Sequence, residues 1–96
     1  MDATTELNTV EEVSRVIDLI CTVDGMELRA MKPAQRRMRA ARLADLFEIR
    51  ARYWHELNVA AHRNDAIPSV YGAACALAER ADRDSARWWR REAGAR

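Results

Sequence analysis

Apolar side chains recur at steps of three and four residues over residues 10–23, the spacing that places them along one face of an α-helix. Thr9 and Glu12 have the spacing of a capping box, which predicts that this helix begins at residue 10. Asp24 and Gly25 are typical of helix ends, so the helix is predicted to end near residue 23. Its apolar positions are Val10, Val13, Val16, Ile17, Ile20 and Cys21.

A longer helix is predicted from Pro33 to about residue 63. Proline fits the first turn of a helix, and no further Pro or Gly occurs before Pro68. Such a helix is about 45 Å long. Arg50 interrupts its apolar face, and the other side is polar. The apolar positions are Leu43, Leu46, Phe47, Tyr53, Trp54, Leu57, Ala60 and Ala61, and the polar positions are Asp45, Glu48, Arg52, His55, Glu56 and His62.

Residues 69–93 are predicted to form a third helix or a pair of helices. The polar run at residues 82–85 can break the segment, because Asp and Ser favour helix caps over helix interiors. The pattern therefore predicts one all-α domain over residues 1–96: a small helical bundle built on a central helix, about 33–63, packed by the helices at about 10–23 and about 69–93. If the last segment is continuous, its apolar stripe is Val70, Ala74, Leu77, Ala81 and Trp88.

Charge is divided unevenly along the chain. Residues 1–28 hold seven acidic side chains and one basic, whereas the rest of the chain holds fifteen basic and eight acidic. Arg36 and Arg39 continue the apolar face of the long helix toward its start, so they are predicted to meet carboxylates on a packed neighbour while Arg37 stays solvated. The candidate carboxylates are Glu11, Glu12 and Asp18, from the first helix or from a second copy.

Three further expectations concern packing and contacts. Trp88 is predicted to be buried on its stripe, which leaves the adjacent Trp89 partly exposed or at an interface. Arg50 and Asp84 interrupt facing stripes, so they are predicted to form a buried ion pair. The candidate interface residues are Trp89, Arg36, Arg39, Arg87 and Arg90.

Catalytic and ligand-binding patterns are weak. His55 and His62 stand seven residues apart, too far along a helix to share one metal ion, and the sequence has no Gly-rich phosphate loop. Cys21 and Cys75 are expected to be buried thiols. No enzyme activity, cofactor, metal or small-molecule ligand is expected. The acidic start and the lack of a long apolar run favour a cytoplasmic protein without a membrane span.

Two local resemblances are short. Residues 70–92 resemble one helix pair of the tetratricopeptide or Sel1-like repeats, but no second copy follows at their period. "LAERADRDSARWWRR" is superficially similar to a helix-turn-helix, with Asp82 and Arg83 where that motif carries Gly and an apolar residue.

The expected function is a non-catalytic protein–protein interaction module that forms homo-oligomers, with itself or another protein as the partner. One alternative is a nucleic-acid-binding protein that uses the arginines of residues 36–42 and 87–91 for phosphate contacts. Another is an inhibitor or accessory protein encoded by a mobile element and binding a host protein.

Overall fold

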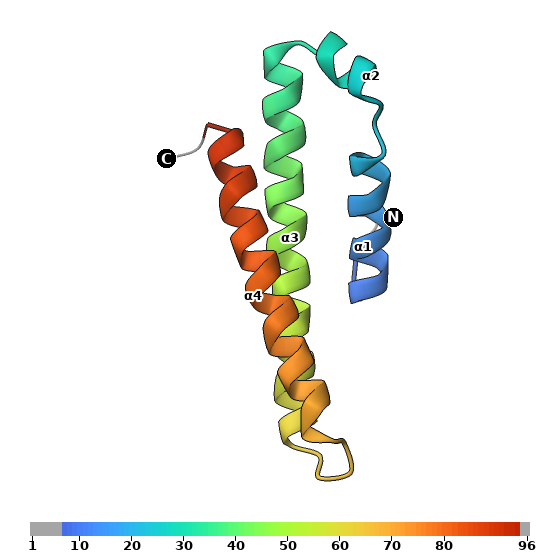
Figure 1. Ribbon diagram of the computed structural model, residues 1–96, viewed down its shortest axis with the longest axis vertical. Helices are drawn as coiled ribbons and strands as arrows, with labels where there is room; N and C mark the ends of the chain where they lie inside the picture. The colour runs from blue at the N-terminus through green and yellow to red at the C-terminus, as the bar shows by residue number, and fades with distance from the viewer. Residues whose placement is uncertain (1–6, 95–96) are drawn as a thin grey trace.

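A computed structural model describes residues 7–94, and the regular structure in this range is entirely helical. The helices are α1 (Val10–Cys21), α2 (Gly25–Ala30), α3 (Pro33–His62) and α4 (Ser69–Glu92). The prediction of an all-α bundle around one long central helix is confirmed (Figure 1). The question left open at residues 82–85 is also answered, because α4 passes through them without a break.

The three long helices form an open arrangement. α1 and α4 pack on different sides of α3, and both run antiparallel to it (Figure 1). The α3–α4 hairpin continues well past the start of α1. The molecule measures 51 × 32 × 24 Å, and its radius of gyration is 15.7 Å. A compact domain of this length would have a radius of gyration of about 12.5 Å, so the chain alone is elongated.

The helix starts follow from local capping. The hydroxyl of Thr9 accepts a hydrogen bond of 3.1 Å from the amide of Glu12, as the capping-box spacing predicts. The Glu12 carboxylate reaches back to the amide of Asn8, at 2.8 Å. The short α2 was not predicted: Asp24, expected only to end the first helix, caps this new one by accepting from the amide of Met26 at 2.7 Å.

The hydrophobic core lies between α1 and the first half of α3. Val13 and Ile17 of α1 meet Leu43 and Leu46 of α3, and all four are buried. Half-buried side chains around them include Trp89 of α4. α1 covers only the first half of α3, so past the start of α1 the hairpin consists of α3 and α4 alone (Figure 1). The further half-buried apolar residues on the core are Leu7, Val16, Ile20, Phe47, Ile49 and Tyr53.

The side of α4 that meets α3 is not the predicted apolar stripe. The buried residues of α4 are Gly72, Asp82 and Ala86. Small residues let the two backbones approach closely, since a Cβ built on Gly72 would lie 3.0 Å from Cε1 of His62. The predicted stripe is rotated away from α3, and all five of its residues (Val70, Ala74, Leu77, Ala81 and Trp88) are exposed. α4 therefore carries two seams. One consists of small and polar residues and faces α3, and the other consists of apolar residues and faces solvent.

Candidate functional site

Arg50 connects all three long helices. Its Nε and Nη2 donate to the two carboxylate oxygens of Asp82, each at 2.8 Å, and its Nη1 donates to the hydroxyl of Ser14 at 2.9 Å. Asp82 is only 4% exposed. The hydrogen bond to Asp82 raises the pKa of Arg50 above its ordinary value, against the effect of partial burial. The guanidinium also lies 5.3 Å from the ring centre of Phe47.

Arg50 is therefore in an ion pair as predicted, but its acidic partner is Asp82 and not Asp84. Two positions along a helix differ by about 200° around its axis, so Asp84 points to solvent when Asp82 points to α3. Asp84 is exposed and pairs with Arg87 one turn later. The ion pair of Arg50 and Asp82 joins α3 to α4 inside the bundle, which is a structural role.

Of the two adjacent tryptophans, Trp88 was predicted to be buried and is exposed, whereas Trp89 is half-buried. Trp89 packs on the core, with the guanidinium carbon of Arg39 5.7 Å from its ring centre. Trp88 is 47% exposed and stands edge-on to Trp89, at a centroid distance of 4.6 Å and an interplanar angle of 86°. Because the α3-facing seam includes residue 89, Trp88 is the tryptophan available to a partner.

Arg39 contacts α1 through the backbone and not through a carboxylate. Its Nη2 donates to the carbonyl of Ile20 at 3.1 Å, in the last turn of α1, where a cation also meets the negative end of the helix dipole. The predicted partners Glu11 and Glu12 lie at the other end of α1, because α1 runs antiparallel to α3. Arg36 is exposed, and no ion pair within residues 7–94 includes it.

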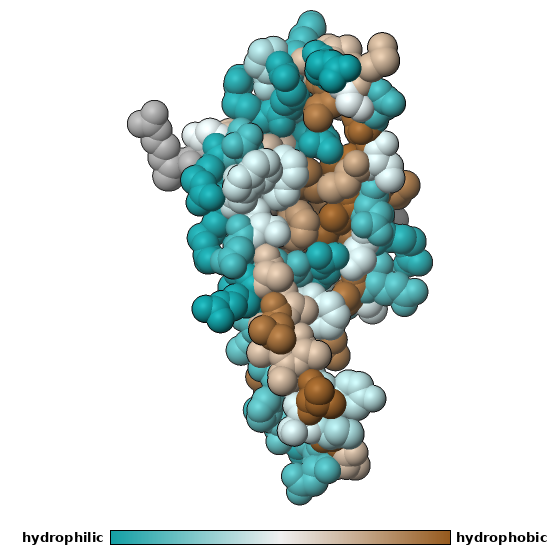
Figure 2. All heavy atoms as spheres, viewed as in Figure 1, coloured by the Kyte–Doolittle hydropathy of each residue, from teal (hydrophilic) through white to brown (hydrophobic). Residues whose placement is uncertain are grey.

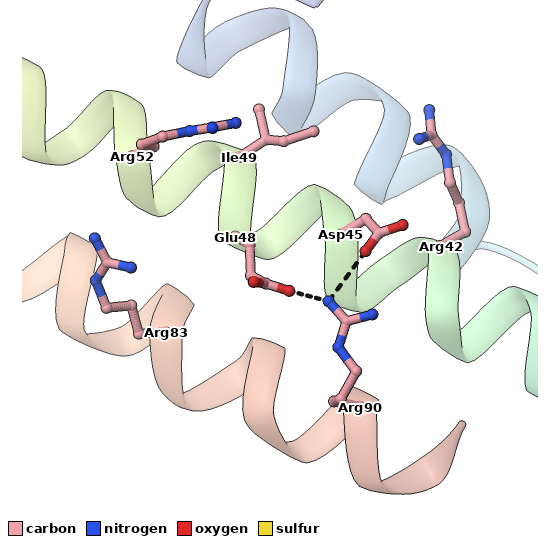
Figure 3. Close-up of a pocket in the computed structure, with 7 residues that line it drawn as sticks. All are labelled: Arg42, Asp45, Glu48, Ile49, Arg52, Arg83 and Arg90. Carbon is pink, nitrogen blue, oxygen red and sulfur yellow. Dashed lines mark hydrogen bonds and ion pairs between the residues drawn. The ribbon is translucent and has the colours of Figure 1, made fainter. Parts of the chain in front are cut away.

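The other arginines of the candidate interface pair within the chain. Arg90 donates to Asp45 at 3.0 Å and to Glu48, both on α3 (Figure 3). Arg87 pairs with Asp84. Arg90 thereby belongs to the α3–α4 contact. The surface around it is a shallow groove of about 460 Å³, lined by Arg42, Asp45, Glu48, Ile49, Arg52, Arg83 and Arg90.

The most distinctive open surface is the exposed seam of α4, which we call the α4 outer face: Val70, Ala74, Leu77, Ala81 and Trp88. Val70 is 65% exposed and Leu77 is 68% exposed, and Tyr71 beside them is 60% exposed. Figure 2 shows apolar side chains in a line over the lower half of α4. Residues 69–78 contain no charged side chain. Exposed apolar side chains that gather on one face are typical of a surface that another protein covers.

The two histidines each lie near an oxygen atom of a neighbouring residue. His55 Nδ1 lies 3.2 Å from Glu79 Oε1, and His62 Nδ1 lies 2.9 Å from the carbonyl of Asn58. Within residues 7–94, no three His, Cys, Asp or Glu side chains are grouped to hold a metal ion. Cys21 is exposed and Cys75 is half-buried, so the prediction of two buried thiols is wrong for Cys21.

Membrane insertion has no support in the helices. None of those formed by residues 7–94 combines the length and the apolar character needed to cross a bilayer.

The sequence did contain the signal for the α4 outer face, since its five residues were recognised as one stripe. The sequence did not indicate that this stripe faces solvent instead of α3. The pattern predicts that this stripe faces the bundle, whereas the contact with α3 uses a row of small residues and one ion-paired aspartate.

No family model matches the chain, and no curated protein or solved structure matches it.

Proposed function

We propose that this protein is a non-catalytic protein–protein interaction module that self-associates through the α4 outer face. The observation that carries the proposal is the exposure of Val70, Leu77 and Trp88 in one row on the outside of the helix pair. Positions 70, 74, 77 and 81 follow the alternating four- and three-residue steps of a coiled-coil seam, and Trp88 lies on the same seam one heptad after Ala81, with Asp84 at the position between them. Such a seam is stable when a second helix covers it.

The small core supports the same proposal. Within residues 7–94, only a few large side chains, led by Leu43, Leu46 and Val13, are fully buried. Domains of this size have little stability to spare, and association that buries apolar surface raises it. Leu57 of α3 is 47% exposed as well, in a pocket that it shares with residues 8–11 at the start of α1.

Light scattering over a range of protein concentrations tests this function. We expect the wild-type chain to be larger than an 11.0 kDa monomer at tens of micromolar. Leu77→Glu places a charge in the seam and should convert the protein to monomers while circular dichroism stays helical. Ala76→Glu, on the exposed side of α4 away from the seam, is the matched control and should remain associated. A wild-type monomer throughout would refute the proposal.

A second candidate function is binding to nucleic acid. The observation that favours it is the meeting of the two arginine clusters, residues 36–42 and 87–91, at one end of the α3–α4 hairpin (Figure 1). The clusters are close, because a Cβ built on Gly94 would lie 3.8 Å from Cδ of Arg37. Arg36, Arg37 and Arg91 are exposed there and can reach phosphates.

Fluorescence anisotropy with labelled duplex DNA or RNA tests this second function. If the arginines contact only the phosphate backbone of the nucleic acid, binding should be weak at physiological salt and show no sequence preference. The affinity should decrease steeply as the salt concentration rises. Arg36→Ala with Arg37→Ala should then abolish what binding exists, and Arg63→Ala at the opposite end of α3 should not. Tight and sequence-selective binding that survives physiological salt would make nucleic acid the principal partner.

A further inference from the structure

The two halves of α4 differ in charge. Residues 69–78 are uncharged, whereas residues 79–92 contain five arginines and four acidic side chains. The α4 outer face runs through both halves, with Val70 and Ala74 in the uncharged half and Trp88 in the charged half. Any partner that lies along the whole seam must therefore accommodate an apolar surface at one end and a strongly charged one at the other.

We propose that the occupant of the α4 outer face is the α4 outer face of a second copy, docked antiparallel. This inference rests on the proposed function and specifies its geometry. A two-fold axis at the level of residue 79 sets Val70 of each copy against Trp88 of the other and Leu77 against Ala81. Ala74 then lies level with Asp84 of the second copy.

Packing favours this register. Well-packed helix pairs place large side chains opposite small ones, so that layers interdigitate without voids. The antiparallel register does this at Leu77 with Ala81 and sets the broad ring of Trp88 against the smaller Val70. A parallel pair in register would instead place Trp88 on Trp88 and Ala81 on Ala81, which alternates overcrowded layers with empty ones.

Charge favours the same direction. Arg87 borders the seam, and a parallel pair would bring it level with Arg87 of the other copy, an arrangement of like charges that destabilises, whereas the antiparallel register sets it level with Tyr71. In the antiparallel pair, the charged half of one α4 faces the uncharged half of the other. Antiparallel helices also bring opposite ends of their dipoles together.

The available surface is large enough for a stable dimer. α4 has 24 residues and is therefore about 36 Å long. A face of that length and two helices wide, about 20 Å, covers about 700 Å² in each copy, or about 1,400 Å² in the pair, which is a standard size for a specific interface. α1 lies on the far side of α3 from most of α4, so it leaves this face open (Figure 1).

Cysteine cross-linking tests the register. In a Cys21→Ser, Cys75→Ser background, Ala81→Cys should link to its own copy through a short bismaleimide, because the two positions are about 6 Å apart along the axis. Ala74→Cys alone and Asp84→Cys alone should not link, since each is about 15 Å from its copy along the axis. A mixture of these two variants should link, because residue 74 of one copy lies level with residue 84 of the other.

The outcomes separate the register from the function. Self-linking of both Ala74→Cys and Asp84→Cys in a dimer would show a parallel pair, which overturns the register while self-association stands. A dimer in which none of the variants links would overturn the α4 outer face as the contact. If light scattering shows that both the wild type and the cysteine-free background are monomers, the proposed function itself is overturned.

Discussion

Arg50 and Asp82 form a two-point ion pair, in which both nitrogen-to-oxygen distances are 2.8 Å. The side chain of Asp82 is 6% exposed and that of Arg50 is 21% exposed, so neither group is well hydrated. Since Arg50 also donates to Ser14, this one side chain fixes α4 and α1 in position on α3. The pair contributes chiefly by determining which side of α4 faces inward.

Removal of one partner from this pair should strongly destabilise the fold. Arg50→Ala leaves the buried Asp82 carboxylate unpaired, and we expect a loss of about 3 to 5 kcal/mol in the free energy of unfolding, measured in urea. Arg52→Ala, on the exposed face of α3, is the control and should change it by less than about 0.5 kcal/mol. Equal stability of the two variants would contradict the structural role of Arg50.

The acidic partner can be identified by the same measurement. Asp82→Ala should destabilise about as much as Arg50→Ala, whereas Asp84→Ala should have little effect, because its pair with Arg87 is exposed. Arg50→Met combined with Asp82→Leu replaces the pair with apolar side chains and should recover most of the lost stability. A larger loss for Asp84→Ala than for Asp82→Ala would refute the assignment.

Substitution of the two adjacent tryptophans should have different effects, with Trp89 needed for folding and Trp88 for self-association. Trp89→Ala removes a ring packed on the core and should lower the free energy of unfolding by about 3 kcal/mol. Trp88→Ala should leave the unfolding of the monomer nearly unchanged and weaken self-association, measured by sedimentation over a concentration series. This reverses the expectation from sequence, which assigned the interface to Trp89. Loss of association only in Trp89→Ala would restore that expectation.

Close packing at Gly72 should limit which side chains are accepted there. A Cβ at this position would already lie 3.0 Å from His62 Cε1 and 3.1 Å from Asn58 Oδ1. Gly72→Leu should therefore force α3 and α4 apart and lower the melting temperature, at a cost of about 1 to 3 kcal/mol. Ala73→Leu is exposed and helix-compatible, so it should melt near wild type. Similar melting temperatures would show that the helices do not approach closely at Gly72.

The contact of Glu79 with α3 should depend on pH. The hydrogen bond from Arg83, and secondarily the one from His55, lowers the pKa of Glu79 below its ordinary value of 4.5. A lowered pKa means that the folded protein favours the ionised carboxylate. Its stabilising contribution is therefore full above the ordinary value and is lost as pH falls through that value to the folded pKa.

Unfolding in urea at a series of pH values tests this contribution. The stability difference between wild type and Glu79→Gln should be constant from about pH 7 to about pH 5.5 and should shrink below about pH 4.5. Glu56→Gln on the exposed face of α3 provides the comparison. A difference that instead grows on acidification would reverse the sign and refute the assignment.

The sequence predicted the helices better than it predicted their contacts. Residue spacing is local, so the capping box at Thr9 and the Pro33 start could be recognised without knowledge of the fold. The six residues of α2 (Gly25–Ala30) carry no clear periodicity, and they were missed. The continuity of α4 through residues 82–85 also depends on a distant residue, since Arg50 satisfies Asp82.

Which face of α4 is buried could not be predicted from hydrophobicity. The usual inference places large apolar side chains inside, and here the inner seam is made of Gly72, Asp82 and Ala86. Close approach of two backbones and one ion pair outweigh the burial of Val70 and Leu77 in the single chain. The error at Trp88 and Trp89 follows from this, because neighbouring residues point about 100° apart on a helix.

The antiparallel hairpin of α3 and α4 also determines how the chain can fold. Its connection, residues 63–68, is short, so α3 and α4 can assemble from that end, beginning with contacts such as that of His55 with Glu79. The guanidinium that binds Ser14 of α1 is held by Asp82 of α4, so the assembled helix pair presents the donor to which α1 docks. α1 is therefore expected to dock last and to open first, as a separate cooperative unit whose amides exchange hydrogen faster than those of the hairpin.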